Sequence, residues 1–458
     1  MPSSSNLYQI LKDHINSVGL PIVPEGKFQN LTQEYTKEVF RETLAEFVAN
    51  ERPEFPLKSI SKEEVGECFK KLLQANYKEY IFVESDKDIM EKFNDYLYPY
   101  SKNGLGVIDA PSVFSKASNA FHQDLRLNCG SYGFRAPIDV WTTGTAKEIW
   151  KCLGPIWRGI NGVSKDKDDN LIGGSLREES YISAFRLGTY IATQFKPIVA
   201  KCIYQMSNAT KVLDTSCGWG DRLCGFYASN AQEYIGCDPN PNTYERYKQQ
   251  CVEYEKLLGH TEASIMEYLW ESKEAANLEF FKCEGKKKVT IYRCGAEDLP
   301  WDDINEIDCA FTSPPYFSTE EYNKGGEHEE DQSWAKFNEY ESWRDNFFIP
   351  VSRNSFESLS ENGLLAINIF DPQIKGKRYR TCDELCTDEK LKSYFMGQIG
   401  MRIMQRPQGK SKFRGEDGKL DKKQLNEFMK KTFIENIWCF SKGKIDLFQE
   451  TTLDKFFE

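Results

Sequence analysis

The tetrapeptide Ser313-Pro314-Pro315-Tyr316 contains the residue types that could hold a planar amino group. It follows the apolar run 307–312, which predicts a strand, so it should lie at a strand's carboxyl end, where open α/β sheets bind ligands. Each proline fixes its own φ and lacks an N–H, so the backbone carbonyls are held away from helical pairing and can accept from an NH2 group. The serine hydroxyl is a further acceptor, and the tyrosine ring offers a face on which a base can stack. The alternative is a structural turn that ends the strand with an aromatic plug.

A second candidate site is the glycine-containing segment 214–221, which joins a predicted strand to a predicted helix. Asp214 ends the strand, and Cys217, Gly218 and Gly220 follow in the turn, where glycines let a ligand approach the backbone closely. Position 223 is Leu, so the segment is not a dinucleotide-binding G-x-G-x-x-G, and it lacks the G-K-[ST] ending of a phosphate loop. A nucleotide-triphosphate site is therefore disfavoured, and a structural turn is the alternative.

Two further strand ends carry acidic residues at positions that suit an adenosine ligand. Asp238 closes the next predicted strand about twenty residues later, where a carboxylate can accept hydrogen bonds from both ribose hydroxyls. Ala296 and Glu297 follow the third predicted strand, where a small residue can flank an adenine ring and a carboxylate can accept from its amine. The alternative for Glu297 is an ordinary acidic loop.

These residues need a sheet to bring them together, and the sequence predicts one. Strands are expected at Lys211–Asp214, Glu233–Cys237, Val289–Cys294, Ile307–Thr312 and Gly363–Ile369, with helices at Leu223–Ser229, Thr243–Leu258 and Tyr340–Ser358 between them. Met401–Gln405 and Glu435–Ser441 predict a final antiparallel pair. Such alternation is typical of an α/β fold with a doubly wound sheet.

The part of the chain before this sheet differs in pattern. Residues 1–100 predict a mainly helical N-terminal region, and residues 101–175 a mixed loop and strand region that could recognise a substrate. Residues 178–206 predict a helix that Pro197 kinks or divides. We therefore expect a third region, residues 176–458, to carry the chemistry, with a basic insertion at 372–433.

Taken in order, the four strand ends resemble the S-adenosylmethionine-dependent amino-methyltransferases of DNA. The resemblance covers residues 176–445, and its most specific element is Thr312-Ser313-Pro314-Pro315-Tyr316-Phe317. It implies a Rossmann-like methyltransferase sheet and S-adenosyl-L-methionine as the cofactor, bound by Asp214, Cys217, Gly218, Gly220, Asp238, Ala296 and Glu297. The family often has Pro after the first acidic residue, where this chain has Thr215.

The resemblance also implies roles for the residues of the fourth strand end. Ser313 and the Pro314 carbonyl would accept from an exocyclic NH2 group, while Tyr316, with Phe317, would stack on a base flipped out of the helix. Ser at the first position favours cytosine N4 over adenine N6. The chain contains no Pro-Cys dipeptide, so methylation of a ring carbon is disfavoured.

Composition limits the partners. The net charge is −11, but a local basic groove suffices for nucleic acid, and the insertion supplies Lys375, Lys377, Arg378, Arg380, Lys410, Lys412 and Arg414 as candidate substrate-binding residues. The 14 cysteines lack a disulfide or zinc spacing, and with only 4 histidines they predict reduced thiols and no metal site. No apolar run approaches about 18 residues and no signal peptide is evident, so we expect an intracellular protein that does not enter membranes.

Two alternatives to a DNA amino-methyltransferase stay open on the sequence. One is an RNA amino-methyltransferase with the same chemistry. The other is a nucleic-acid-binding module that kept the fold but lost catalysis, for which the bulky Trp219 between two glycines is the argument. The sequence does not decide the oligomeric state, the recognition sequence, or whether the protein belongs to a restriction-modification pair.

Overall fold

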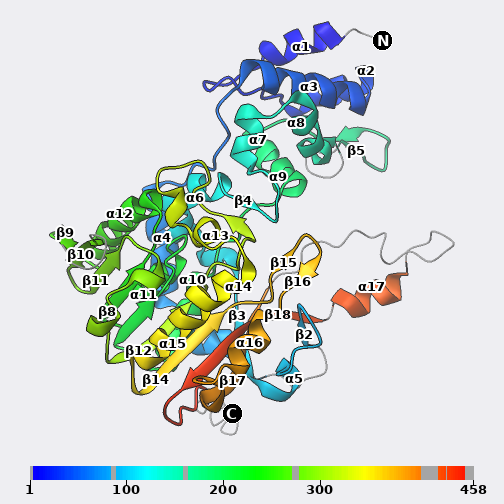
Figure 1. Ribbon diagram of the computed structural model, residues 1–458. Helices are drawn as coiled ribbons and strands as arrows, with labels where there is room; N and C mark the ends of the chain where they lie inside the picture. Colours follow the sequence, from blue (N-terminus) through cyan, green and yellow to red (C-terminus); the bar gives the residue numbers. More distant parts are fainter. Residues whose placement is uncertain are drawn as a thin grey trace. The chain divides into compact units, whose positions relative to one another are not determined.

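The computed structural model describes residues 4–83, 89–157, 163–270, 278–403, 421–429 and 431–448 (Figure 1). The chain forms two compact units. Unit 1 comprises residues 1–60, 123–193 and 320–324, and unit 2 comprises residues 61–122, 194–319 and 325–458. All four strand ends singled out in the sequence belong to unit 2, so this unit carries the candidate site.

Unit 2 is built on a twelve-stranded sheet in the order β1-β3-β17-β18-β14-β12-β7-β8-β11-β10-β9, with β2 paired to β18. Its central strands are β7 (Lys211–Asp214), β8 (Glu233–Cys237), β11 (Lys288–Tyr292), β12 (Ile307–Thr312), β14 (Leu359–Asn368), β17 (Phe395–Arg402) and β18 (Thr432–Ser441). The five strands from β14 to β11 are parallel, whereas β18 runs antiparallel between β14 and β17.

The chain lays down this sheet in two directions from its centre. It first builds β7, β8 and β11 on one side, then returns to build β12 and β14 on the other, so the topological switch lies between β7 and β12. The predicted Rossmann-like methyltransferase fold is confirmed. β12, which precedes Ser313-Pro314-Pro315-Tyr316, is the fourth of the parallel strands along the chain, and β17 and β18 form the predicted antiparallel pair. Ligands of such sheets bind outside the carboxyl ends of the strands at the switch.

Side chains alternate along each strand and so build one hydrophobic core on each face of the sheet. Val212 and Phe311 pack on the face covered by α4 (Lys62–Gln74), α10 (Pro197–Met206), α11 (Asp221–Tyr227) and α12 (Pro241–Leu257). Leu213 and Ala310 pack on the opposite face, against α14 (Tyr340–Trp343), α15 (Ile349–Glu357) and α16 (Thr381–Thr387). Both faces are therefore covered, as a parallel sheet requires.

The sheet contains five strands to which the sequence analysis gave no bounds, although β3 lies in the predicted loop and strand region 101–175. These strands are β1 (Ile81–Phe82), β2 (Ile89–Glu91), β3 (Gly104–Asp109), β9 (Ser264–Trp270) and β10 (Leu278–Glu284). All of them extend the sheet at its edges except β2, which pairs with the inner strand β18. β9, β10 and β11 form an antiparallel meander, and β3 lies parallel to β17. The predicted helix 178–206 is divided, since α9 (Glu178–Gly188) ends before Pro197, which begins α10.

Unit 1 is mainly helical and has its own core. It contains α1 (Ser4–Lys12), α2 (Glu25–Glu34), α3 (Lys37–Glu51), α7 (Pro137–Thr143), α8 (Ala146–Cys152) and α9, with β4 (Gly130–Ser131) paired to β13 (Glu320–Glu321). Trp141 is fully buried in this core, and its indole N–H donates to the Pro53 carbonyl at 2.6 Å.

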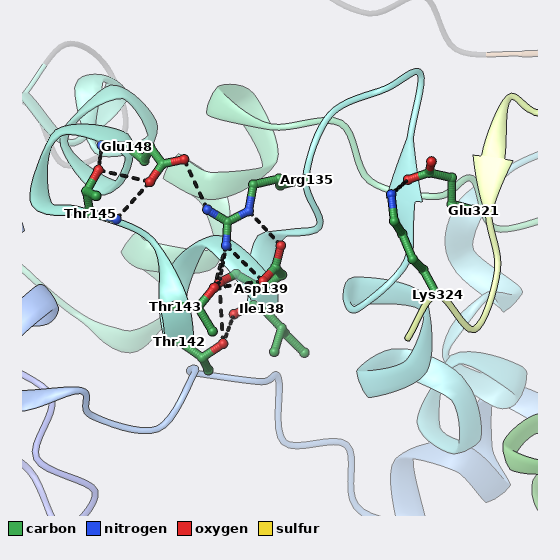
Figure 2. A network of polar contacts seen from close by, with 9 residues as sticks. All are labelled: Arg135, Ile138, Asp139, Thr142, Thr143, Thr145, Glu148, Glu321 and Lys324. Atoms are coloured by element: carbon green, nitrogen blue, oxygen red, sulfur yellow. Dashed lines mark hydrogen bonds and ion pairs between the residues drawn. The ribbon is translucent and has the colours of Figure 1, made fainter. Parts of the chain in front are cut away.

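Figure 2 shows how polar side chains join α7 to α8 in unit 1. Arg135 pairs with Asp139 at 2.7 Å and with Glu148 at 3.0 Å. Glu148 also completes a capping box with Thr145 at the start of α8. Because these groups are exposed, the network orders this corner of unit 1 and adds little to its stability.

Candidate functional site

Two strand-end loops meet at the topological switch through a single serine. Ser216, in the loop after β7, places its hydroxyl 2.7 Å from the Thr312 hydroxyl and donates to the Ser313 carbonyl at 2.9 Å. Thr312 is the last residue of β12, so the bond joins the glycine loop to the Ser-Pro-Pro-Tyr segment. The two loops that the sequence assigned to cofactor and amino group are therefore direct neighbours.

The two glycines of the first loop, Gly218 and Gly220, are needed for different physical reasons. Gly218 and Gly220 both have positive φ, +58° and +67°, which other residues rarely adopt. A Cβ at Gly220 would clash with the Gln250 side chain, whose amide also donates to the Gly220 carbonyl at 2.8 Å. A Cβ at Gly218 would be in ordinary van der Waals contact, 3.7 Å from the Ser216 carbonyl oxygen, so the positive φ is the reason for glycine at this position. Trp219 between them is buried, with 8% of its surface exposed.

Asp214 lies beneath this loop rather than facing out of it. Its carboxylate is fully buried, pairs with the Arg222 Nε at 2.9 Å, and accepts from the Tyr234 hydroxyl at 2.7 Å. Arg222 in turn donates to the Ser216 carbonyl. Although burial opposes it, the interaction with Asp214 raises the pKa of Arg222. These contacts show that Asp214 holds the glycine loop in place. Its direct contact with a cofactor stays a prediction.

Asp238 sits at the carboxyl end of β8 with a dense set of donors. Its Oδ1 accepts from the Asn240 N–H at 2.9 Å and from Thr243 at 3.1 Å. Its Oδ2 accepts from the Tyr247 hydroxyl at 2.8 Å and from the Gly218 N–H at 3.2 Å. Burial raises the pKa of Asp238 to about 6, despite these donors, which favour the charged form. Asp238 is half-buried, and its bond from Gly218 ties the end of β8 to the glycine loop.

The third strand end supplies a small buried residue and a paired carboxylate. Ala296 is buried at the start of a short 3-10 turn, 296–298. Glu297 is paired with Lys336 at 2.7 Å, and Lys336 also pairs with Asp298 at 2.8 Å. Burial raises the pKa of Glu297, while Lys336 opposes this shift. If Glu297 accepts from the adenine amine as predicted, its carboxylate must bind the adenine and Lys336 at the same time.

The fourth strand end forms a polar cluster that sequence reasoning did not anticipate. The Tyr316 hydroxyl lies 2.8 Å from Glu435 Oε1, 3.0 Å from the Asn368 carbonyl and 3.4 Å from the Ser313 hydroxyl. Its ring meets the ring of Phe370 edge-on, with centroids 4.7 Å apart. Asn368 ends β14 and Glu435 lies on β18, so three strand ends converge on Tyr316. The sequence signal for Glu435 is a carboxylate at the start of the predicted strand 435–441, ahead of the apolar run 437–440.

Phe317 lies apart from this cluster, in the core on one face of the sheet. It is 5% exposed, has φ of 52°, and is surrounded by the rings of Tyr340, Trp343 and Tyr379. The stacking role that the resemblance implies for it stays a prediction.

The arginines of the basic insertion have carboxylate partners. Arg378 pairs with Asp371 at 2.7 Å and also with Asp95. Arg380 pairs with Asp95 at 2.7 Å and donates to Asp383 at 2.6 Å. These contacts tie the segment before α16 to residues that precede β3 in the chain, so much of their charge is neutralised locally.

The other basic residues predicted to bind the substrate divide into two groups. Lys375 and Lys377 are exposed on the short hairpin of β15 (Gln373–Ile374) and β16 (Lys377–Arg378), so their charges face solvent. Lys410, Lys412 and Arg414 lie outside the described residues.

A small apolar cavity lies behind the Ser-Pro-Pro-Tyr loop. It has a volume of about 10 Å³ and is lined by Thr215, Pro314, Phe347 and Val351 among others, so it holds at most one water. Thr215 is buried, and its hydroxyl has no hydrogen-bond partner among the described residues. A ligand the size of a nucleoside does not fit in this cavity.

The described parts of the chain contain neither a metal-ligand cluster nor a membrane-spanning helix. Within them, no group of three or more His, Cys, Asp or Glu side chains is arranged to hold a metal ion. None of the described helices combines the length and the apolar character needed to cross a membrane.

Comparison with known proteins gives structural likenesses only. No protein-family model and no curated protein matches the chain. Trm1 from Pyrococcus horikoshii, solved with S-adenosyl-L-methionine, is 17% identical over 39% of this chain, with a TM-score of 0.24. The match spans 38% of Trm1, well under two thirds of its length.

Two further solved structures match more of their own length. A SAM-dependent O-methyltransferase from Thermotoga maritima is 11% identical over 66% of this chain and 82% of its own, with a TM-score of 0.28. An rRNA methylase from Streptococcus thermophilus is 12% identical over 55% of this chain and 100% of its own, with a TM-score of 0.26. At these scores the fold assignment rests on the strand order described above.

Proposed function

We propose that the protein transfers a methyl group from S-adenosyl-L-methionine to an exocyclic amino group of a nucleobase in DNA. The observation that carries the proposal is the Ser216 bridge, which joins the glycine loop to the Ser-Pro-Pro-Tyr loop at the topological switch. A donor site and an amino-group site on these two loops would share one border, as a direct transfer between two bound reactants needs.

The residues of the first three strand ends suit the cofactor. Asp238 and Gly218 are both partly exposed; Asp238 would accept from the ribose hydroxyls, the Gly218 backbone would lie against the nucleoside, and Ala296 would flank the adenine ring with a small side chain. When bound, the cofactor supplies an electrophilic methyl carbon, whose bond to sulfur breaks with both electrons staying on sulfur as the new N–C bond forms.

The fourth strand end would hold the amino group. Ser313 and the Pro314 carbonyl would accept its two N–H bonds, which draws the nitrogen lone pair toward the methyl carbon. Pro315 would keep that backbone rigid, and Tyr316 would contact the base. With Ser at position 313, cytosine N4 is the favoured acceptor and adenine N6 the next.

Nucleic-acid binding is assigned to segments outside the sheet's strand ends. We assign it to residues 101–175 and to the insertion 372–433, whose exposed Lys375 and Lys377 support a phosphate-contacting role. The predicted division into a helical region 1–100, a recognition region 101–175 and a catalytic region 176–458 stays a prediction; of these, residues 61–122 lie in unit 2 and residues 176–193 in unit 1.

The direct test is methyl transfer followed by nucleoside analysis. Purified protein is incubated with methyl-deuterated cofactor and, separately, duplex DNA, single-stranded DNA or structured RNA, and the digested nucleosides are identified by mass spectrometry. We expect deuterated N4-methylcytosine from DNA. Label that appears only with RNA would move the assignment to an RNA amino-methyltransferase.

Variants connect the product to the site. Ser313→Ala and Tyr316→Ala should abolish incorporation, whereas Ser360→Ala, on the far end of β14, should not. Calorimetry with S-adenosylhomocysteine shows whether each variant keeps the cofactor site. A protein that binds nucleic acid but neither cofactor nor its product would be the non-catalytic module.

A further inference from the structure

The cluster around Tyr316 contains a directed chain of hydrogen bonds. A tyrosine hydroxyl has one proton to donate. Glu435 Oε1 is its nearest acceptor, at 2.8 Å, and bonds to a carboxylate are stronger than bonds to a carbonyl. When that proton is directed to Glu435, the Ser313 hydroxyl, 3.4 Å away, can only donate to the Tyr316 oxygen. The lone pairs of Ser313 then remain to accept from a substrate.

This arrangement answers a chemical need of the proposed reaction. An amino nitrogen that has just been methylated carries one proton too many, and the described residues around Ser313 include few groups that could take it. Among the groups in the cluster, Asn368 offers an amide and its carbonyl, neither of which is a useful base. Glu435 is the carboxylate in contact with Tyr316.

We propose that Ser313, Tyr316 and Glu435 form a relay that carries the proton from the methylated nitrogen to Glu435. The N–H bond breaks, its electron pair stays on nitrogen, and the proton binds the Ser313 oxygen. Ser313 passes its own proton to Tyr316, and Tyr316 passes its own to Glu435. Both hydroxyls end neutral, one carboxylate becomes a carboxylic acid, and no other reactant is needed. This inference rests on the proposed function and adds the destination of the proton.

The surroundings of Glu435 suit a proton acceptor. Burial raises its pKa, while hydrogen bonding from Tyr316 and the charge of Lys92 oppose the rise. Burial also raises the pKa of Tyr316, so this hydroxyl passes a proton without ionising. Across β17 the neighbour is the uncharged Met401, and Glu91 lies on the neighbouring strand β2.

The variant that separates a relay from a merely structural bond is Glu435→Gln. A glutamine oxygen can still accept from Tyr316 but cannot keep a proton. We expect the single-turnover rate to fall about 100-fold, the usual scale for a lost general base. In the wild-type protein the rate should fall at low pH as Glu435 gains a proton, and this acidic limb of the pH–rate profile should disappear in the variant. Tyr316→Phe keeps the ring but interrupts the relay, and should lower the rate similarly. S-adenosylhomocysteine affinity should not change in either variant.

Glu91→Gln is the matched control, because Glu91 is also a partly buried carboxylate with a raised pKa but bonds to Asn436 instead of Tyr316. It should keep both the rate and the acidic limb. A readout independent of turnover is the carboxyl titration of Glu435 by 13C NMR. Tyr316→Phe should raise that pKa further, since the tyrosine's hydrogen bond lowers it.

Several results would overturn the relay. A Glu435→Gln protein with the wild-type rate and pH profile removes it while leaving the proposed function intact. A carboxyl titration unaffected by Tyr316→Phe breaks the link between the two residues. If the wild-type protein methylates no nucleic acid, the proposed function fails, and the relay fails with it.

Discussion

Cofactor binding should depend on pH through Asp238. Burial raises the pKa of this carboxyl to about 6, so it gains a proton as the pH falls through that value. At pH 7 about nine tenths of the carboxyl is ionised and at pH 5 about one tenth. If the ribose hydroxyls need the charged form as their acceptor, the Kd for S-adenosylhomocysteine should rise about tenfold between these two pH values. Above about pH 7 it should be constant.

Isothermal titration calorimetry at intervals from about pH 5 to pH 8 measures this dependence. Asp238→Asn should bind at least about tenfold more weakly at pH 7, because one charge-assisted hydrogen bond is worth about 1.5–3 kcal/mol, and its Kd should not vary with pH. Asp302→Asn, an exposed carboxylate on a nearby turn, should behave as wild type. A wild-type Kd that stays constant down to pH 5, or a pH dependence that persists in Asp238→Asn, would refute the role of Asp238.

Two further predictions concern stability. Lys287 is buried and donates to three carbonyls at the end of α11, at 2.7–2.8 Å, so Lys287→Met should lower the free energy of unfolding by about 2–4 kcal/mol, whereas Lys288→Met at the exposed neighbour should change it by less than about 0.5 kcal/mol. Denaturant unfolding measures both, and equal effects would contradict the capping role. Gly220→Ala should destabilise the fold by more than about 2 kcal/mol, because it adds a clash with Gln250 to the strain of a positive φ, whereas Gly218→Ala should cost only about 1–2 kcal/mol. Gly218→Ala should nevertheless weaken S-adenosylhomocysteine binding, because Gly218 donates to Asp238, and unchanged affinity would show that Gly218 is not part of the cofactor site.

The sequence predicted the centre of the sheet well and its edges poorly. β8 and β12 match their predicted bounds, because short apolar runs between turn residues define buried parallel strands with little help from their partners. β17 begins at Phe395, before the predicted Met401, since Gly397 has φ of 135° at a register shift and Gly400 also weakens the strand pattern. β9 and β10 were missed because an antiparallel edge pair depends on β11 for its partner.

The site divides in the same way. Residues at the carboxyl ends of parallel strands, such as Asp238, could be placed from the sequence, because the predicted order of strands and helices indicates which strand ends lie at one edge of the sheet. Contacts between segments that lie far apart in the chain could not be predicted. Glu435 lies 119 residues after Tyr316, and Asp95 lies 283 residues before Arg378. A count of basic residues therefore predicted free positive charge where the fold provides carboxylate partners.

The Ser216 bridge has a consequence for how the acceptor site can change. Ser216 bonds to the carbonyl of residue 313 and to Thr312, and it leaves the side chain at position 313 out of the joint. A different residue at 313 would therefore leave the connection between the two loops intact. The joint between the two loops does not restrict which side chain stands at position 313, although the proposed proton relay needs the Ser313 hydroxyl. Ser313→Asp separates the two roles, because the loop connection should survive this substitution.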